Sequence, residues 1–450
     1  MNKKMIIALP IGAAEIIKRL ESAGYEAYAV GGCVRDSLLG RQVSDWDITT
    51  SAGPEEVKEV FSGERIIDSG IKHGTLTVRL READYEITTF RTDGEYSDLR
   101  RPDSVTFVKS LEEDLARRDF TVNAMAWSER TGLVDMFGGV RDLKRGVIRC
   151  VGEPERRFRE DALRIMRAVR FASVLDFRLD FDTAQTAVFE RERLRFISAE
   201  RFSEELLKLL CGKAARRILL DYLDIPAVWI PELIPMRGFG QHHPCHMYDI
   251  LGHTAAVVEA IPAREDLRLA ALLHDIGKPK CFTRDDDGRG TGHFKFHAAK
   301  GAEMAEEICC RLKLSRALTQ KVKTLIFWHN YRGAISDKGI RRRLNELTPD
   351  DFFDILELAQ ADMYGKTELG RVEESSLEDT RARAREIIER GECITKTQLA
   401  IDGSDLLALG LKPSRKVGQI LDELFSDVLD DVIPNERAAL LEKAKRLIDE

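Results

Sequence analysis

The hydrophobic pattern changes character about a third of the way along the chain. Residues 11–23 have helical periodicity, and residues 28–30 form a short apolar run. Residues 74–80 and 85–90 alternate in the manner of strands. Beyond that part strand signals fade, and helical periodicity continues to the C-terminus. The pattern predicts an α+β protein, with a mixed head followed by an extended helical region.

Length and composition narrow the class of protein. At roughly 100–200 residues per domain, a chain of 450 residues is expected to form about three domains. Gly and Pro are concentrated at 229–244, which predicts a junction between domains there. No run of about 18 apolar residues occurs, so we expect no membrane span. The 8 cysteines include no Cys-x-x-Cys pair, which indicates reduced thiols and a cytoplasmic location. The net charge of −7 argues against general coating of nucleic acid, although local basic strips can still bind phosphate.

A glycine-rich turn follows the first apolar run. Gly31 and Gly32 precede Arg35 and Asp36 where a strand gives way to a helix. Paired glycines let phosphate approach backbone N–H groups at a helix N-terminus. Alone, such a pair is more often simply a tight turn.

Two aspartates come nine residues later. Asp45 and Asp47 flank Trp46, and in a strand both carboxylates would point to one face. Carboxylates held this close repel unless a cation lies between them, and Mg²⁺ takes one or two carboxylates with substrate phosphate oxygens. A two-metal site would activate an attacking 3′-hydroxyl and neutralise the pyrophosphate that leaves. A solvated acidic turn is the alternative, and the Gly31-Gly32 turn upstream makes it the weaker one.

Two further segments carry charge in a pattern. Arg118 could neutralise a triphosphate, and Asn123 could hold a ribose hydroxyl or its own loop. Residues 159–172 predict one helix on which Asp161, Arg164, Arg167 and Arg170 recur every three residues. A carboxylate with a guanidinium fork can read a base edge. A salt-bridged amphipathic helix is the other interpretation.

Taken together, these segments resemble the class II tRNA nucleotidyltransferases, the bacterial CCA-adding enzymes and their poly(A) polymerase relatives. The resemblance implies a polymerase-β-like head followed by an elongated all-helical neck, body and tail. The expected bounds are 1–142 for the head, 143–235 for the neck, 236–375 for the body and 376–450 for the tail. It implies tRNA as acceptor, CTP and ATP as substrates, and no membrane.

The same resemblance implies the residues of the site. Mg²⁺ would bind Asp45 and Asp47, and Glu86 is our candidate for a third carboxylate from its strand phase with Thr88 and Phe90. Asp161 and Arg164 would pair with the incoming base as a protein template. The full set of expected nucleotide-binding residues is Gly31, Gly32, Arg35, Arg118, Asp119, Asn123, Asp161, Arg164, Arg167 and Arg170.

The resemblance to the family leaves open which nucleotides are added to the RNA end. The loop at 91–102 resembles the intact flexible loop of enzymes that add all three nucleotides, which favours CCA addition over a CC-only enzyme. An A-only enzyme and a poly(A) polymerase remain alternatives, because poly(A) polymerases share much of the template segment.

A second metal site is expected in the helical region. His274-Asp275 and the residues around it resemble the centre of the HD phosphohydrolases, an HD domain that would span roughly 246–365 and form the body. The resemblance implies a divalent transition metal bound by His253, His274, Asp275, His297, His329 and Asp362. Imidazole and carboxylate ligands suit such a metal, which would activate water for attack on a cyclic or terminal RNA phosphate. Alternatively this domain only holds tRNA, or the whole chain is an HD phosphohydrolase with a regulatory nucleotide-binding head.

Overall fold

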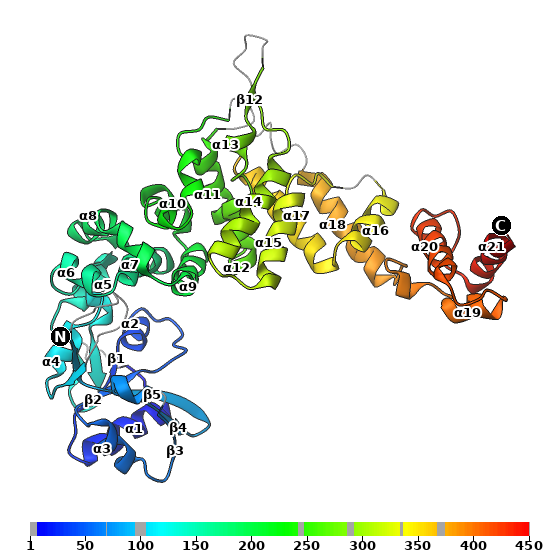
Figure 1. The fold of residues 1–450 in the computed structure, drawn as a ribbon. Coiled ribbons are helices and arrows are strands. Elements are labelled where there is room, and N and C mark those ends of the chain that lie inside the picture. The colour runs from blue at the N-terminus through cyan, green and yellow to red at the C-terminus, as the bar shows by residue number, and fades with distance from the viewer. Residues whose placement is uncertain are drawn as a thin grey trace. The chain divides into compact units, whose positions relative to one another are not determined.

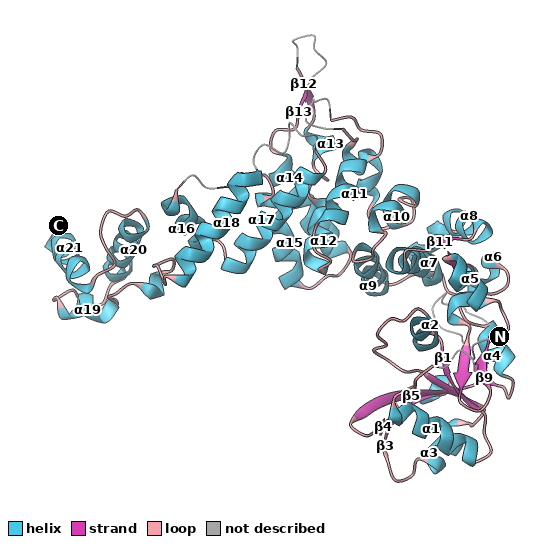
Figure 2. Cartoon of the chain, turned by 180° about the vertical axis from the view of Figure 1, so that it is seen from behind, coloured by secondary structure: helices cyan, strands magenta, loops and turns pink. Residues whose placement is uncertain are grey.

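The computed structural model describes residues 7–68, 70–94, 105–241, 247–285, 292–333, 336–366 and 374–449. The chain divides into two compact units, Met1–Ile234 with Arg311–Lys313, and Pro235–Cys310 with Leu314–Glu450. Figures 1 and 2 show the large sheet near the N-terminus and helices through the remainder. Within the described ranges, no helix combines the length and apolar character that a membrane span requires.

A seven-stranded sheet is the centre of the head. Its strands are β1 (Ala27–Val30), β2 (Ile48–Thr50), β3 (Arg65–Ile67), β4 (Thr75–Leu80), β5 (Ala83–Thr89), β8 (Ala126–Ser128) and β9 (Gly132–Val134). They lie in the order β3-β4-β5-β2-β1-β8-β9, with β2 and β5 parallel and the other neighbours antiparallel. All four residues of β1 are buried, which explains why its sequence is an apolar run rather than an alternation.

Short helices complete the head. They are α1 (Ile11–Ser22), α2 (Gly32–Leu38), α3 (Pro54–Val60), α4 (Leu111–Ala116) and α5 (Gly139–Arg145), with 3-10 turns η1 (Ile71–His73) and η2 (Thr121–Asn123) and the strand pair β6 (Arg91–Asp93) and β7 (Val105–Phe107). α1 and α3 pack together beside the sheet (Figure 1). In β5 Glu86 is exposed and Thr88 is half-buried, and Phe90, just after the strand, is buried.

The rest of the first unit is the neck. Its elements are β10 (Val147–Ile148), α6 (Pro154–Glu160), α7 (Leu163–Leu175), β11 (Arg178–Leu179), α8 (Phe181–Phe189), η3 (Arg191–Phe196), α9 (Ala199–Leu210), α10 (Ala215–Asp221), η4 (Pro226–Val228) and η5 (Pro231–Met236). The predicted apolar row of Leu163, Met166 and Val169 is buried. α7 contains most of the charged segment at 159–172, and it packs along α9.

In its described residues, the second unit is helical apart from the short hairpin of β12 and β13. Its elements are α11 (Ile250–Ala260), α12 (Glu265–Leu273), α13 (Lys278–Cys281), β12 (Thr283–Arg284), β13 (Gly292–His293), α14 (His297–Arg311), α15 (Arg316–Trp328), α16 (Asp337–Glu346), α17 (Pro349–Tyr364), α18 (Glu374–Glu389), η7 (Lys396–Gln398), α19 (Gly403–Ala408), α20 (Arg415–Leu429) and α21 (Arg437–Asp449). α16, α17 and α18 share one apolar core around Phe352 and Leu377. α19, α20 and α21 share another around Leu406 and Leu424.

Candidate functional sites

Gly31 and Gly32 form the turn between β1 and α2. Gly31 has a φ of 82°, a left-handed conformation that residues with a side chain rarely adopt. A Cβ on Gly31 would lie 3.0 Å from Nη1 of Arg118. Glycine is therefore required both by the backbone and by the guanidinium beside it. The turn presents its backbone next to a fixed positive charge, an arrangement suited to phosphate oxygens.

Asp45 and Asp47 lie just before β2 rather than within it. The strand begins at Ile48, although the N–H of Val30 still donates to the carbonyl of Asp47 at 3.0 Å. Asp47 therefore continues the β1–β2 pairing, while Asp45 precedes it. The hydroxyl of Ser44 donates to the Asp45 carboxylate at 2.9 Å.

The carboxylates of Asp45, Asp47 and Glu86 influence one another. Burial raises the pKa of Asp47, Arg118 opposes the rise, and the charge of Asp45 adds to it. Burial also raises the pKa of Glu86, as do the charges of Asp47 and Asp45. Repulsion among three acids beside one arginine is the electrostatic setting of a cation site. The carboxylate oxygens of Asp45, Asp47 and Glu86, which all lie in the described ranges, do not all come within 4.8 Å of one another.

Asp114 anchors the two arginines at 117 and 118. Its fully buried carboxylate pairs with Arg117 at 2.7 Å and with Arg118 at 3.3 Å. Burial would raise the pKa of Asp114, but the two guanidinium groups hold it below its ordinary value. Arg118 is thereby held where it acts on both Asp47 and the Gly31 turn. Sequence reasoning missed Asp114, because one buried acid in a charged helix has no periodic signal.

A buried chain of hydrogen bonds joins α7 to α2. Arg167 donates twice to Oδ2 of Asp119, at 2.7 and 2.9 Å. The Asn123 amide donates to Oδ1 of Asp119 at 3.0 Å and accepts from Arg35 at 2.6 Å. Burial alone would raise the pKa of Asp119, but Arg167 and Asn123 outweigh it and lower the pKa to about 2. Arg35, Asp119, Asn123 and Arg167, four of the expected residues, thus come together, and the network ties α7 to the helix that follows the glycine turn.

The charged segment expected as one helix is two helices that break at Asp161. α6 ends at Glu160 and α7 begins at Leu163. Asp161 is extended, and its Oδ1 accepts from the N–H of Leu163 at 3.0 Å. This local side-chain bond to the backbone competes with helix continuation. Asp161 therefore lies at the start of α7 rather than on a continuous stripe.

Arg164 is almost buried, at 8% exposure. Its Nη1 donates to Glu160 at 2.8 Å, and its Nη2 donates to the carbonyl oxygen of Arg117 at 3.0 Å. The carboxylate of Asp161 pairs instead with Arg201 of α9, at 3.1 Å. The two expected template residues are neighbours, but each has its own protein partner.

Arg167 and Arg170 surround the ring of Phe171. The guanidinium carbon of Arg170 lies 3.6 Å from the ring centroid, and that of Arg167 lies 5.3 Å from it. Glu205 of α9 accepts from Arg170 at 2.6 Å and lies 3.8 Å from Arg167. Glu205 was not foreseen, and it fixes these two arginines from the neighbouring helix.

Family models match three parts of the chain. The model described as "Poly A polymerase head domain" matches residues 27–149. The model described as "Probable RNA and SrmB- binding site of polymerase A" matches 176–236. A model for domain 2 of tRNA nucleotidyltransferases matches 294–444.

Relatives match the chain along almost its whole length. The CCA-adding enzyme of Lactobacillus delbrueckii subsp. bulgaricus is 38% identical over 96% of this chain and 96% of its own. The chain belongs to the class II tRNA nucleotidyltransferases, the family of the CCA-adding enzymes. The CCA-adding enzyme of Lactobacillus helveticus is 37% identical over 96% of this chain and 95% of its own. The crystal structure of the Bacillus stearothermophilus CCA-adding enzyme in complex with CTP covers 97% of both chains, with a TM-score of 0.73 and 31% identity. The expected fold, a polymerase head followed by a helical region, is confirmed.

In this member of the family, six side chains of the second unit form a compact cluster. They come from α11, the end of α12, the start of α14, the end of α15, and α17. Two groups have ligand atoms within 4.8 Å of one another: His253, His274 and Asp362, and Asp275, His297 and His329. Asp275 joins the groups, because one carboxylate oxygen lies 3.2 Å from His274 and the other lies 3.6 Å from His297. All six expected ligands are therefore brought together.

The charges of this cluster are balanced by lysines. Lys278 lies 2.7 Å from Asp275, and Lys366 pairs with Asp362. Burial lowers the pKa of His274, but Asp275 and Asp362 outweigh it and raise the pKa to about 9. Burial and the neighbouring His274 lower the pKa of His329 to about 3. The carboxylates thus favour positive charge on His274, whereas burial and His274 keep the His329 imidazole neutral, the form that binds a metal.

One expectation from the sequence falls largely outside the described residues. The loop at 91–102 is described only as far as residue 94, so the expected intact flexible loop is not tested. Among the described cysteines, all are free thiols.

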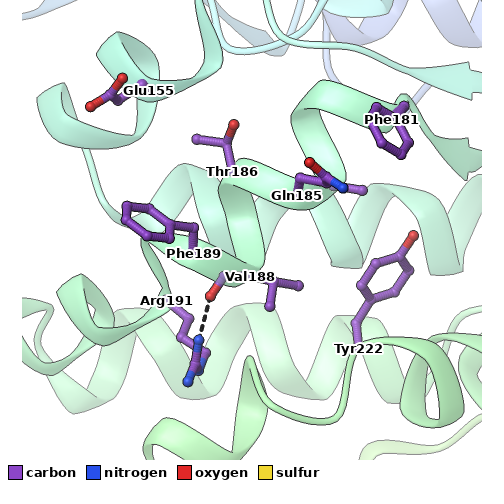
Figure 3. A pocket seen from close by; sticks show the side chains of 9 residues that line it. Glu155, Phe181, Gln185, Thr186, Val188, Phe189, Arg191 and Tyr222 are labelled. Atoms are coloured by element: carbon purple, nitrogen blue, oxygen red, sulfur yellow. Dashed lines mark hydrogen bonds between the residues drawn. The ribbon is translucent and has the colours of Figure 1, made fainter.

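The neck also contains a separate hollow beside α8 (Figure 3). It has a volume of about 790 Å³, and its lining includes Phe181, Phe189 and Tyr222. Phe181 and Phe189 are 70% and 78% exposed. The guanidinium of Arg191 donates to the carbonyl oxygen of Val188 at 2.6 Å. None of the expected site residues lines this hollow.

Proposed function

We propose that this chain adds C, C and A to the 3′ end of tRNA from CTP and ATP, without a nucleic-acid template and with Mg²⁺. The observation that carries the proposal is the full-length match to CCA-adding enzymes together with an acidic group beside a glycine–arginine turn in the head. We place the reaction in the cytoplasm, where free thiols such as those described here stay reduced.

In the head, Asp45 and Asp47 would hold Mg²⁺, with Glu86 as the third carboxylate. The raised pKa values of Asp47 and Glu86 fit a site that a divalent cation completes. When bound, Mg²⁺ would activate the 3′-hydroxyl and neutralise the pyrophosphate. The Gly31-Gly32 backbone and Arg118 would bind the triphosphate, since they place N–H donors and a guanidinium side by side.

In the neck, Asp161 and Arg164 would read the incoming base. Asp161 supplies an acceptor at the start of α7, and Arg164 a guanidinium fork a single turn later. Arg35, Asp119, Asn123 and Arg167 would keep this template in place relative to the phosphate turn, through the buried network that joins them. Arg170 would support the same helix through Glu205.

The variant Arg164→Ala should damage nucleotide choice more than RNA binding. One good bidentate contact to a base is worth about 1–3 kcal/mol of discrimination, so selectivity should fall by about fivefold to a hundredfold. Incorporation of CTP, ATP, UTP and GTP would be compared with that of Arg156→Ala, because Arg156 pairs with the same Glu160 from an exposed position. If Arg164→Ala keeps all four selectivities, Arg164 serves only as an ion-pair partner.

We further propose four functional parts: the head at 1–142, the neck at 143–235, the body at 236–375 and the tail at 376–450. The proposed ends of the head and neck, at 142 and 235, lie near the ends of the two N-terminal family matches, at 149 and 236. The start of the second unit at Pro235 supports the limit between neck and body.

Three related activities compete with full CCA addition. A poly(A) polymerase would extend an RNA with ATP alone, a CC-only enzyme would stop after CTP, and an A-only enzyme would require an acceptor that already ends in CC. Incubating tRNA that ends before CCA, and tRNA that already ends in CC, with CTP, with ATP, or with both separates all of them. Full CCA addition requires CC with CTP alone and CCA with both nucleotides.

A second function is favoured by one observation, the six-ligand cluster of the second unit. We propose that it is an HD site which binds divalent transition metal, with Asp275 between two cation positions. Imidazole and carboxylate donors fit such ions. The bound metal would make water acidic enough to attack phosphate. The proposed substrates are 2′,3′-cyclic phosphates or terminal phosphates at RNA ends.

A further inference from the structure

We propose that Gly365 is a positioning residue that controls one of the two cation positions in the six-ligand histidine–aspartate cluster of the second unit, and does not control the other. The first position is formed by His253, His274 and Asp362, and the second by Asp275, His297 and His329. The inference rests on the proposed HD site, because it concerns how that site holds its ions. Gly365 follows the last residue of α17, and it is not among the ligands expected from the sequence.

The four histidines of the cluster are oriented in the same way. Each imidazole is hydrogen-bonded through Nδ1 to a backbone carbonyl oxygen. For three of them the carbonyl lies three residues earlier in the chain, at 2.8 Å for His274, 2.6 Å for His297 and 2.6 Å for His329. A carbonyl oxygen can only accept, so Nδ1 carries the proton and Nε2 of the neutral ring is the nitrogen left to bind a metal.

The Nε2 atoms converge on one another and on aspartate oxygens. Nε2 of His253 lies 3.4 Å from that of His274 and 2.9 Å from Oδ1 of Asp362. Nε2 of His297 lies 3.2 Å from that of His329. Lone pairs held this close repel one another unless a cation lies between them. Each ligand group therefore presents its donor atoms in the form and direction that a metal ion requires.

His253 differs from the other histidines in what holds its ring. Its Nδ1 donates at 3.0 Å to the carbonyl oxygen of Gly365, 112 residues further along the chain. The other three rings are held by the backbone of their own segments. The orientation of His253 therefore depends on how the end of α17 packs against α11. Gly365 thus acts on the first position, and no ligand of the second position relies on it.

The next residue of the chain holds a second ligand of the same position. Lys366 pairs with Oδ2 of Asp362, which leaves Oδ1 facing His253. Residues 365 and 366 therefore hold two of the three ligands of the first position from one side. Among the described residues, neither of them bonds a ligand of the second position.

Only glycine fits between the end of α17 and the His253 ring. A Cβ on Gly365 would lie 2.4 Å from Nδ1 and 2.7 Å from Cε1 of His253. The three atoms nearest to that Cβ all belong to His253. The φ of Gly365 is −78°, which residues with a side chain adopt freely. The variant Gly365→Ala therefore displaces the His253 ring without straining its own backbone.

The test measures how many ions the full-length wild type, Gly365→Ala and Gly418→Ala bind. Each protein would be stripped with a chelator and equilibrated with Co²⁺ in excess Mg²⁺, which occupies the oxygen ligands of the head. Bound Co²⁺ would be counted by mass spectrometry and its affinity measured by calorimetry. Wild type should bind two ions and Gly365→Ala one, because losing an outer partner of a ligand weakens binding about tenfold to a hundredfold.

Gly418→Ala is the matched control in the same unit. Gly418 lies within α20, and an added Cβ would have no described neighbour within 4 Å outside its own helix. This variant should bind two ions with the affinity of wild type. It shows that exchanging glycine for alanine in the second unit does not by itself disturb the cluster.

A double variant separates an effect on the His253 ring from general damage to the fold. In His253→Ala the space that the added Cβ needs is free, so Gly365→Ala should change neither metal content nor unfolding temperature further in that background. If Gly365→Ala alone does not fold, the double variant must fold and bind one ion, as His253→Ala does. A double variant that does not fold would overturn the inference.

The remaining outcomes distinguish the inference from the proposed HD site. Two ions bound by Gly365→Ala at wild-type affinity would overturn the inference and leave the HD site in place. Loss of both ions in Gly365→Ala would overturn it too, and so would a wild type that binds a single ion. A wild type that binds no Co²⁺, Mn²⁺ or Ni²⁺ would overturn the HD site and the inference with it.

Discussion

Replacing Asp47 with alanine should reduce nucleotide addition at least about a hundredfold and leave tRNA affinity nearly unchanged. Loss of even an outer partner of a metal ligand costs about 10–100-fold, and Asp47 is proposed as a direct ligand. Burial and the charge of Asp45 raise the pKa of Asp47, and a bound cation would oppose both effects. Asp45→Ala should behave alike. Tight tRNA binding should survive, because RNA phosphates are held by basic groups rather than by acids.

The control for Asp47→Ala is Asp84→Ala in β5 of the same sheet. Asp84 is about half exposed and pairs with Arg79 at 3.2 Å, so its loss removes one carboxylate without touching the site. Addition would be followed with radiolabelled CTP and ATP, and tRNA binding by filter retention. Near-normal addition by Asp47→Ala would remove the proposed active site. If nucleotide addition by Asp84→Ala fell by a similar factor, the effect of Asp47→Ala would be a general consequence of losing a negative charge.

The variant Asp275→Ala should abolish the proposed phosphohydrolase activity and metal binding of the histidine–aspartate cluster, while CCA addition stays largely unchanged. Asp275 lies between the two ligand groups, so its loss removes a donor from both. The carboxylates proposed for Mg²⁺ in addition belong to the other compact unit. Metal content would be measured by mass spectrometry, and hydrolysis of 2′,3′-cyclic AMP with Mg²⁺, Mn²⁺, Ni²⁺ and Co²⁺. Asp275→Asn repeats the test with the side-chain volume preserved.

Glu303→Gln serves as the control in the second unit. Glu303 is 63% exposed on α14 and pairs with Lys300, away from the ligand set. It should retain both metal and hydrolysis. If the wild-type protein hydrolyses nothing with any of the four metals, the cluster has only a structural role. Collapse of addition in Asp275→Ala would show that the two sites depend on each other.

Local chemistry was predictable from the sequence, and long-range pairing was not. Gly31 and Asp47 could be singled out because a Gly-Gly turn and two aspartates spaced two residues apart can be recognised in the sequence itself. The two helices that meet at Asp161 could not be separated, because the charge pattern continues unbroken through the break. At the break the N–H of Leu163 donates to the Asp161 carboxylate, a local bond that competes with helix continuation.

The partners that hold the site were missed for a related reason. Asp114, Arg201 and Glu205 act across helix contacts, so their roles depend on packing that no periodicity encodes. The six ligands of the second unit were named from resemblance. Their division into two groups around Asp275 is a property of the fold and had no signal in the sequence.

Sequencing the 3′ ends of a tRNA substrate tests the central claim most directly. Wild-type protein with Mg²⁺ would be incubated with tRNA that ends before CCA, and supplied with CTP and ATP together. The account predicts that ends gain C, C and A in that order and then stop. Long A tails, or ends that stop at CC in the presence of ATP, would contradict it.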